Sequence, residues 1–119
     1  MEYLHSRTPP IIHKDLKCSN LFIDGIISAV RIGDLGLASH STKSSPIAGT
    51  LEYMAPEIID SNTYNEKTDM YAFGMCLLEL ITKNPPYYEC ATTGELITKV
   101  LSVCDLTWLW SVGKITWIN

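Results

Sequence analysis

The stretch IIHKDLKCSNLFI, residues 11–23, crowds five polar side chains between two apolar runs. They are His13, Lys14, Asp15, Lys17 and Asn20. Apolar runs of this kind are typical of a chain that enters and leaves a folded core, and polar groups beside a core need hydrogen-bond or charge partners. So much polar chemistry in so short a space indicates a candidate functional loop.

The composition of the whole chain limits its function class. The 119 residues have the length of one small domain, and the formal charge of −4 gives no electrostatic case for nucleic acid or an anionic membrane as a partner. No apolar run reaches the roughly 18 residues of a membrane span. Four widely spaced cysteines, with no C-x-x-C pair, favour reduced thiols over a disulfide framework or a zinc site. We therefore expect a cytoplasmic protein.

Local patterns predict a hairpin early in the chain and a Ser/Thr-rich loop after it. A short helix ends before Pro9, and residues 20–25 and 29–34 have the pattern of two strands joined through an Asp-Gly turn, with Val30 and Ile32 alternating against Arg31. Residues 39–49 have no apolar period, which is typical of an exposed loop.

Helical patterns dominate the second half. TDMYAFGMCLLELIT, residues 68–82, has almost no polar face and predicts a helix buried on all sides, ended by Asn84-Pro85-Pro86. Such a helix implies a larger surrounding protein, and a chain without the later helices would leave part of it exposed. Thr92 and Glu95 have the spacing of a capping box before an amphipathic helix.

Three further motifs follow the opening stretch: DLG at 34–36, GTLEYMAPE at 49–57 and DMYAFG at 69–74. In this order, with HKDLKCSN at 13–20, they resemble the C-terminal lobe of a protein kinase. The resemblance implies a partial α+β protein-kinase-like fold over residues 1–100, a mainly helical C-lobe with a small β-hairpin next to the catalytic loop. Residues 101–119, which hold all three tryptophans, are expected to be a divergent tail.

Within the kinases, DLKCSNLFI, IGDLGLA, AFGMCLLELIT and PPYYEC are most similar to the with-no-lysine (WNK) group. This resemblance implies a serine/threonine protein kinase that uses ATP and Mg²⁺ and phosphorylates Ser or Thr hydroxyls of proteins. It also implies that Leu35 lies beside a chloride-binding position. Thr50 together with Lys17 is the pattern of kinases that act on Ser or Thr rather than on Tyr.

The resemblance assigns the chemistry to four residues. Asp15 accepts or orients the proton of the substrate hydroxyl, and Lys17 balances charge on the transferred phosphoryl group. Asn20 and Asp34 are the expected magnesium ligands, because Mg²⁺ prefers oxygen donors. Taken singly, each has an ordinary alternative as a turn cap, a solvated cation or the start of a loop. Their joint spacing favours the catalytic interpretation.

Four other positions have supporting roles in the same resemblance. Asp69 anchors the catalytic loop by accepting its backbone N–H groups. Ser44 and Ser45 are candidate phosphorylation sites whose phosphate could pair with Lys14. Lys14 stands where the family has Arg, so it lacks the planar fork that grips a phosphate with two bonds.

Glu57 is expected to lack its usual partner. In kinases the Glu of A-P-E pairs with an Arg farther along the chain, and the two arginines here, Arg7 and Arg31, both precede it. The sequence also has no Gly-rich loop, phosphate-contacting lysine strand or adenine hinge of an N-lobe. We therefore expect this fragment to be inactive alone. A truncated gene product, a degenerate fragment and a non-catalytic interaction module all stay open as alternatives.

Overall fold

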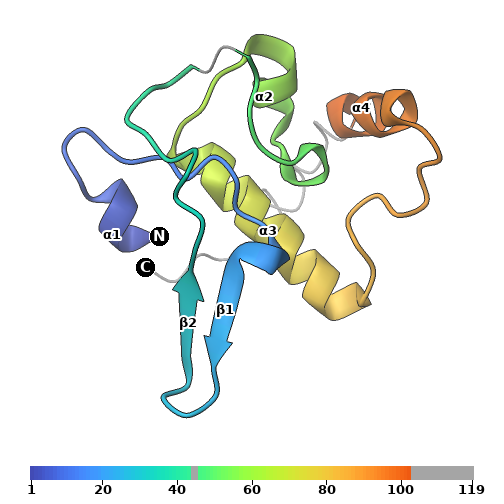
Figure 1. Cartoon of the computed structure of the whole chain (residues 1–119). Helices are drawn as coiled ribbons and strands as arrows, with labels where there is room; N and C mark the ends of the chain where they lie inside the picture. Colours follow the sequence, from blue (N-terminus) through green and yellow to red (C-terminus); the bar gives the residue numbers. More distant parts are fainter. Residues whose placement is uncertain (44–45, 103–119) are drawn as a thin grey trace, which may run out of the picture.

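Helix α3, Glu66–Thr82, runs through the middle of the molecule, and the other elements lie around it (Figure 1). The computed structural model describes residues 1–43 and 46–102. The remaining elements in this part of the chain are α1 (Glu2–His5), β1 (Leu21–Asp24), β2 (Ala29–Ile32), α2 (Pro56–Ser61), α4 (Thr93–Ser102) and the 3₁₀ turns Cys18–Asn20 and Leu51–Tyr53. The predictions for Ser44, Ser45 and almost all of the tail, residues 103–119, lie outside the described residues.

The predicted central helix is confirmed, and its start is explained by a capping box. The side chain of Asn65 accepts hydrogen bonds from the backbone N–H groups of Lys67 (2.8 Å) and Thr68 (3.2 Å), and Thr68 Oγ1 accepts one from Asn65 N (3.2 Å). These bonds satisfy donors that have no partner inside the helix. The helix ends at Lys83, which adopts the left-handed conformation at φ 59°.

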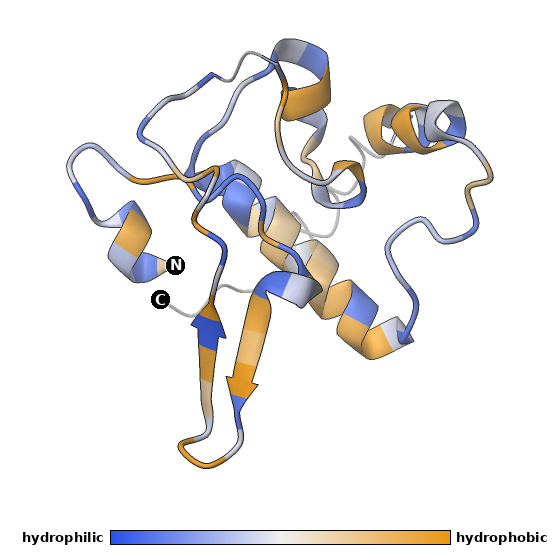
Figure 2. Ribbon diagram, viewed as in Figure 1, coloured by the Kyte–Doolittle hydropathy of each residue, from blue (hydrophilic) through white to orange (hydrophobic). Residues whose placement is uncertain are grey.

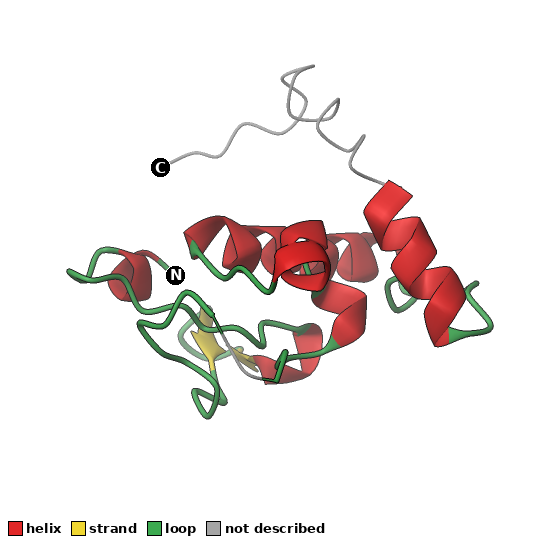
Figure 3. Ribbon diagram, turned by 90° about the horizontal axis from the view of Figure 1, so that it is seen from above, coloured by secondary structure: helices red, strands yellow, loops and turns green. Residues whose placement is uncertain are grey.

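The prediction that this helix is buried on all sides is wrong for its C-terminal half. The buried residues belong to its first part, Thr68, Asp69, Ala72, Met75 and Cys76. In contrast, Leu80 is 61% exposed and Ile81 79% exposed. The physical reason is that α4 packs against α2 and leaves the end of α3 uncovered in the described part of the chain (Figure 3).

The core lies between the opening stretch, α2 and the first half of α3. It consists of Ile12, Met54, Ala55, Ile58 and Tyr64, against which Leu51, Ile59 and Tyr71 pack. α2 begins with Pro56 in its first turn, where a missing N–H does no harm. This core therefore fixes the segment that carries A-P-E underneath the segment that carries HKDLKCSN.

The predicted hairpin is confirmed, with a longer connection than expected. β1 and β2 pair antiparallel from Leu21 opposite Ile32 to Asp24 opposite Ala29. Asp24 Oδ1 accepts hydrogen bonds from the N–H groups of Ile26 (3.0 Å) and Ile27 (3.3 Å), so the turn spans four residues rather than an Asp-Gly pair. Figure 2 shows an apolar hairpin, yet Ile26 is 97% exposed and Val30 62% exposed. Its alternating pattern does not predict which side chains are buried.

The predicted amphipathic helix is confirmed as α4, with half of its capping box. Thr92 Oγ1 accepts a hydrogen bond from Glu95 N (3.2 Å), but Glu95 Oε2 accepts from Ala91 N (2.8 Å) instead of returning to Thr92. Leu96 and Val100 are buried. Among the described residues, no helix is both long and apolar enough to cross a bilayer. The part of the chain that the structure describes thus has a two-stranded sheet beside a helical body.

Candidate active site

A buried carboxylate on α3 fixes the path of the opening stretch. Asp69, 2% exposed, accepts hydrogen bonds from the backbone N–H groups of His13 (2.8 Å) and Lys14 (3.0 Å). Its Oδ2 is also 2.8 Å from Nε2 of His5. Burying a carboxylate is costly unless several donors surround it, and three donors do so here. These are the contacts that the resemblance implies for Asp69, with His5 as an addition.

The backbone of this stretch is bent where Asp69 holds it. Lys14 adopts a positive φ of 71°, a conformation that few non-glycine residues adopt. Gly49 faces the same point: at φ 116°, a Cβ on it would lie 2.6 Å from the carbonyl oxygen of Lys14. Only glycine allows the two backbones to approach so closely. This approach brings the residue after Gly49 against the opening stretch.

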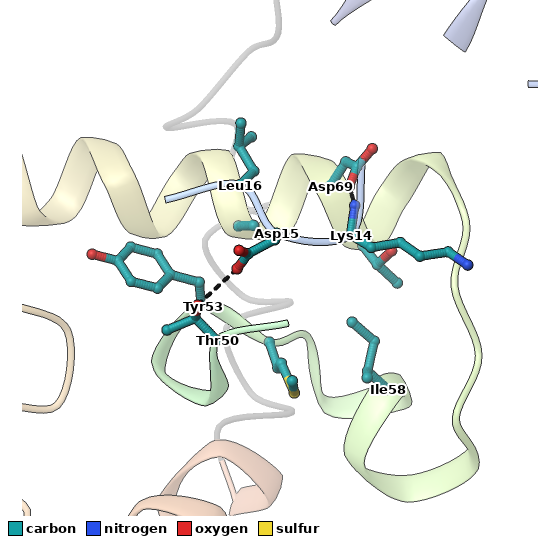
Figure 4. A pocket seen from close by; sticks show the side chains of 10 residues that line it. Lys14, Asp15, Leu16, Thr50, Tyr53, Ile58 and Asp69 are labelled. Atoms are coloured by element: carbon teal, nitrogen blue, oxygen red, sulfur yellow. Dashed lines mark hydrogen bonds between the residues drawn. The ribbon is translucent and has the colours of Figure 1, made fainter. Parts of the chain in front are cut away.

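That residue, Thr50, joins the two expected catalytic side chains, Asp15 and Lys17, and Figure 4 shows its bond to Asp15. Its Oγ1 donates a hydrogen bond to Asp15 Oδ1 (2.7 Å) and accepts one from Lys17 Nζ (3.0 Å). Lys17 Nζ lies 3.6 Å from the other carboxylate oxygen of Asp15. The three side chains therefore form one compact group in which a carboxylate and an ammonium are held at fixed positions.

His13 connects this group to the DLG motif. Its Nδ1 accepts a hydrogen bond from Asp15 N (3.2 Å), which assigns the ring proton to Nε2, and Nε2 then donates to Gly33 O (2.9 Å). The ring is fully buried. With both ring nitrogens engaged in hydrogen bonds inside the protein, His13 is held in place as a structural residue would be.

The two expected magnesium ligands, Asn20 and Asp34, lie near Gly33, the residue whose carbonyl oxygen His13 contacts. Asn20 Nδ2 donates to Asp15 O (2.8 Å), and Asn20 O accepts from Gly33 N (2.8 Å). Asp34, next to Gly33, is exposed with a φ of 54°, and its Oδ1 accepts a hydrogen bond from Gly36 N (3.3 Å). Asn20 and Asp34 thus lie on segments joined by backbone hydrogen bonds.

The side-chain oxygens of Asn20 and Asp34 fit a magnesium ion better than a metal ion that is enclosed by protein ligands alone. Asn20 uses its amide nitrogen internally, so its oxygen is the atom left for a ligand role, and Asp34 adds an exposed carboxylate. Mg²⁺ takes one or two protein oxygens and completes its shell with water and phosphate oxygens. Residues 1–43 and 46–102 contain no cluster of three or more His, Cys, Asp or Glu side chains that could enclose a metal.

A small cavity lies beneath the opening stretch and does not form the site. Its volume is about 10 Å³, and its lining is Lys14, Asp15, Leu16, Thr50, Tyr53, Met54, Ile58, Thr68, Asp69 and Ala72 (Figure 4). A space of this size is no larger than a single water. The group formed by Asp15, Lys17 and Thr50 therefore lies on closely packed residues.

Lys14 points to the loop after DLG. Its Nζ donates a hydrogen bond to Ser39 Oγ (2.7 Å) and lies 5.0 Å from the centre of the Tyr64 ring. Burial lowers the pKa of Lys14, and the Asp69 charge opposes that effect. Tyr64 OH in turn donates to Ala48 O (2.6 Å) and accepts from Ala48 N (3.0 Å). Lys14 therefore joins both flanks of the Ser/Thr loop.

A second polar group lies where Cys18 and Tyr53 contact α3. Tyr53 OH donates to Glu79 Oε2, and Cys18 Sγ donates to the carbonyl oxygen of Cys76 (3.6 Å). Burial and the Glu79 carboxylate raise the pKa of Tyr53, and burial raises the pKa of Cys76 to about 12. Burial and Glu79 also raise the pKa of Cys18. The raised pKa values keep Tyr53, Cys18 and Cys76 uncharged at neutral pH.

Two other residues singled out from the sequence lie apart from the group of Asp15, Thr50 and Lys17. Leu35 is 55% exposed on the surface beside Asp34. Glu57 is half-buried, and within residues 1–43 and 46–102 no salt bridge reaches it. The chloride role of Leu35 and the lack of an Arg partner for Glu57 stay predictions.

Sequence reasoning missed four residues that shape the site: His5, Tyr53, Tyr64 and Glu79. His5 and Tyr64 are separated in sequence from the groups they contact, so no local spacing reveals them. Tyr53 lies inside the quoted motif GTLEYMAPE, and Glu79 is the one charged residue in an otherwise apolar run, 68–82, after Asp69. An isolated charge in a buried helix needs a partner, and that signal could have identified Glu79.

Comparison with known proteins gives one family. The sequence model of the protein kinase domain matches residues 1–115. Over 104 residues, which are 86% of its length, the chain is 50% identical to "Serine/threonine-protein kinase WNK" of Caenorhabditis elegans and 49% identical to "Serine/threonine-protein kinase WNK3" of Mus musculus. It is also 48% identical over 104 residues to "Probable serine/threonine-protein kinase WNK10" of Arabidopsis thaliana. The aligned part spans 6%, 6% and 20% of these curated relatives, respectively.

Proposed function

This chain belongs to the protein kinase family, and from that premise we propose that it carries the phosphotransfer part of a WNK-like serine/threonine kinase. The reaction would move the γ-phosphate of ATP to a Ser or Thr hydroxyl of a protein substrate. The observation that supports this best is the group formed by Asp15, Thr50 and Lys17. It holds a carboxylate and an ammonium together at the surface of a rigid floor.

The proposed roles follow from the charges that such a reaction develops. Phosphoryl transfer depends on positioning and charge neutralisation more than on covalent chemistry by the protein. Asp15 orients the substrate hydroxyl and accepts its proton as the oxygen bonds to phosphorus and the bond to ADP breaks. Lys17, held by Thr50, neutralises charge on the transferred group. Both side chains lose entropy in advance because Thr50 already holds them.

Asn20 and Asp34 are the residues that would hold magnesium. When bound, Mg²⁺ would neutralise phosphate charge and orient the nucleotide. Two hydrogen bonds support this assignment: Asn20 Nδ2 donates to the carbonyl oxygen of Asp15, and Gly33 N, next to Asp34, donates to the carbonyl oxygen of Asn20.

We assign residues 1–100 to the C-terminal lobe of the kinase and residues 101–119 to a tail that diverges from it. The Gly-rich loop and adenine-binding segment have no counterpart in the 119 residues. We therefore propose that transfer occurs in a longer polypeptide that supplies them, and that this fragment alone is inactive. Cytoplasmic location, protein substrates and ATP as partners, and no nucleic-acid or membrane partner, belong to the same proposal.

A second candidate is a non-catalytic interaction module. The observation that favours it is the apolar surface on the hairpin and on the end of α3, including Ile26 at 97% exposure and Ile81 at 79%. Either a further part of the kinase or another protein would cover such a surface. The two candidates differ in whether Asp15, Asn20 and Asp34 perform chemistry.

The test is an Asp34→Ala substitution in a polypeptide that also carries the N-lobe. Incorporation of labelled phosphate from MgATP into a Ser-containing protein is measured, with Asp24→Ala as the matched control. Asp24 is another partly exposed carboxylate, near Arg31 on the hairpin. We expect a loss of about 100-fold or more for Asp34→Ala, in the range for removal of one charge-stabilising group, and little change for Asp24→Ala. Equal rates for the two variants would remove Asp34 from the metal site.

A further inference from the structure

Two thiols face each other where the catalytic loop crosses α3. Cys18 begins the 3₁₀ turn Cys18–Asn20, and its Sγ lies 3.6 Å from the carbonyl oxygen of Cys76. Cys76 is fully buried in the middle of α3, and Cys18 is half-buried. The pKa of each thiol is influenced by the other, as expected of neighbouring side chains, and both are free thiols. Neither takes part in the chemistry proposed above.

We propose that Cys18 and Cys76 are an oxidation-sensitive pair, which a hydroperoxide converts into a disulfide that ties the catalytic loop to α3. The two cysteines are 58 positions apart in sequence, so only the folded chain brings them into contact. A contact of this kind gives the two sulfurs a high effective concentration in the folded state, whereas they meet rarely in an unfolded chain.

The reaction balances with one equivalent of peroxide. The Cys18 sulfur attacks one peroxide oxygen, the O–O bond breaks, and the released oxygen takes up a proton to leave as water or an alcohol. This step oxidises Cys18 to a sulfenic acid. The Cys76 sulfur then attacks the Cys18 sulfur, the S–O bond breaks, and the second oxygen leaves as water with the remaining proton. Two thiols are oxidised and one peroxide is reduced.

The surroundings make the pair slow rather than inert. Burial and the neighbouring Glu79 disfavour a negative charge on Cys18, so the first step is expected to be slower than at an open thiol. Cys18 is nevertheless the more accessible of the two, and so it is the sulfur that meets the oxidant first. Cys76, shielded from solvent, acts as the resolving thiol.

The disulfide would reshape the site, because Cys18 lies directly after Lys17 and two residues before Asn20. A disulfide brings two sulfurs to about 2.05 Å, closer than any non-bonded contact, so the turn must move toward α3. Lys17 and Asn20 would move with it. We therefore expect the oxidised form of the longer kinase to lose transfer activity and to regain it when a thiol reductant cleaves the bond.

The direct test uses the full 119-residue chain with Cys90→Ser and Cys104→Ser, so that Cys18 and Cys76 are its only thiols. The chain is treated with excess hydrogen peroxide in buffer and, in parallel, in concentrated urea. Intact mass and peptide mapping then report the products. The expected result is the loss of two hydrogen atoms, a crosslinked Cys18–Cys76 peptide and faster formation in buffer than in urea, all reversed by dithiothreitol. Cys18→Ser and Cys76→Ser in the same background must abolish the crosslink.

Other outcomes overturn the proposal. They are crosslinking only in urea, disulfides only between separate chains, or stepwise oxygen addition at Cys18 without a crosslink. This mass measurement does not depend on kinase activity, so the proposed function can fail while the thiol pair stands. Conversely, a longer kinase that transfers phosphate but shows no crosslink retains the proposed function and loses this inference.

Discussion

The two halves of α3 differ in burial, and the difference is opposite to the one that their hydropathy predicts. The N-terminal half carries charged and polar residues, including Asp69, and is the half that the rest of the chain encloses. The C-terminal half, with Leu77, Leu78, Leu80 and Ile81, is almost wholly apolar and is exposed (Figure 2). In an isolated soluble domain the reverse arrangement is expected.

The difference shows which contacts this chain supplies by itself. Around Asp69, the donors are backbone N–H groups from the opening stretch and a side chain from α1, all within the described residues. Around Leu80 no described element provides a covering surface. The first half of α3 therefore behaves as the core of this segment, and the second half leaves large apolar side chains exposed among the described residues.

The largest effect on this comparison is expected from Asp69→Ala. The change leaves the buried N–H groups of His13 and Lys14 without an acceptor, at about 1–3 kcal/mol each. We expect the free energy of unfolding, measured with urea, to fall by about 3–5 kcal/mol, in the range for breaking a buried charged network.

Two variants bracket that result. Asp69→Asn keeps one oxygen acceptor and should lose less stability than Asp69→Ala. Asp60→Ala removes an exposed carboxylate from α2 and should stay within about 0.5 kcal/mol of the parent. If Asp69→Ala lowers the free energy of unfolding no more than Asp60→Ala does, the Asp69 carboxylate does not hold the enclosed half of α3. The proposed cause of the difference between the two halves would then be wrong.

A smaller effect should appear at alkaline pH through Cys76, also in the enclosed half. Burial raises the pKa of its thiol from 9.0 in the unfolded chain to about 12. Between these values the folded chain keeps a proton that the unfolded chain has lost, so stability falls as pH rises. Below the unfolded value, the thiol adds no pH dependence.

The matched measurement compares the parent with Cys76→Ala by urea unfolding, under reducing conditions, at about pH 7.5 and about pH 10. The parent should lose more stability over this interval than Cys76→Ala does. Lys14, whose lowered pKa makes stability rise with pH, contributes equally to both proteins and cancels in the difference. Cys90→Ala, at a half-buried position between α3 and α4, should behave like the parent. Parallel curves for Cys76→Ala and the parent would mean that the thiol meets solvent.

Much of this arrangement could be predicted from sequence, because it depends on short-range patterns. The hairpin follows from two strand-like runs around a turn, and α3 follows from an apolar run ended by prolines. The contacts of Asp69 with the backbone of the opening stretch, and the association of Thr50 with Lys17, came from the resemblance to a known family. Their catalytic roles stay predictions, as do those of Asn20 and Asp34.

Other features could not be predicted, for physical reasons. The contact of His5 with Asp69 joins residues 64 apart, and no local period encodes it. The ammonium of Lys14 contacts Ser39 and the Tyr64 ring because both flanks of the Ser/Thr loop converge on it, which is a property of the folded backbone. The exposure of the end of α3 depends on what surrounds the helix. Hydropathy alone predicts that the helix is covered, but it does not show by which segment.

The smallest effect is expected from the paired substitution Leu80→Lys and Ile81→Lys. Both side chains are exposed, and Lys is as good a helix former as Leu and better than Ile. The free energy of unfolding should therefore change by no more than about 0.5 kcal/mol per site, while self-association seen by sedimentation should decrease because an apolar patch gains charge. The matched control, Ala72→Lys, places the same charge in the enclosed half and should unfold the chain. If the paired variant unfolds as readily as Ala72→Lys, the end of α3 is covered in solution. The two halves of the helix would then be equivalent parts of one core.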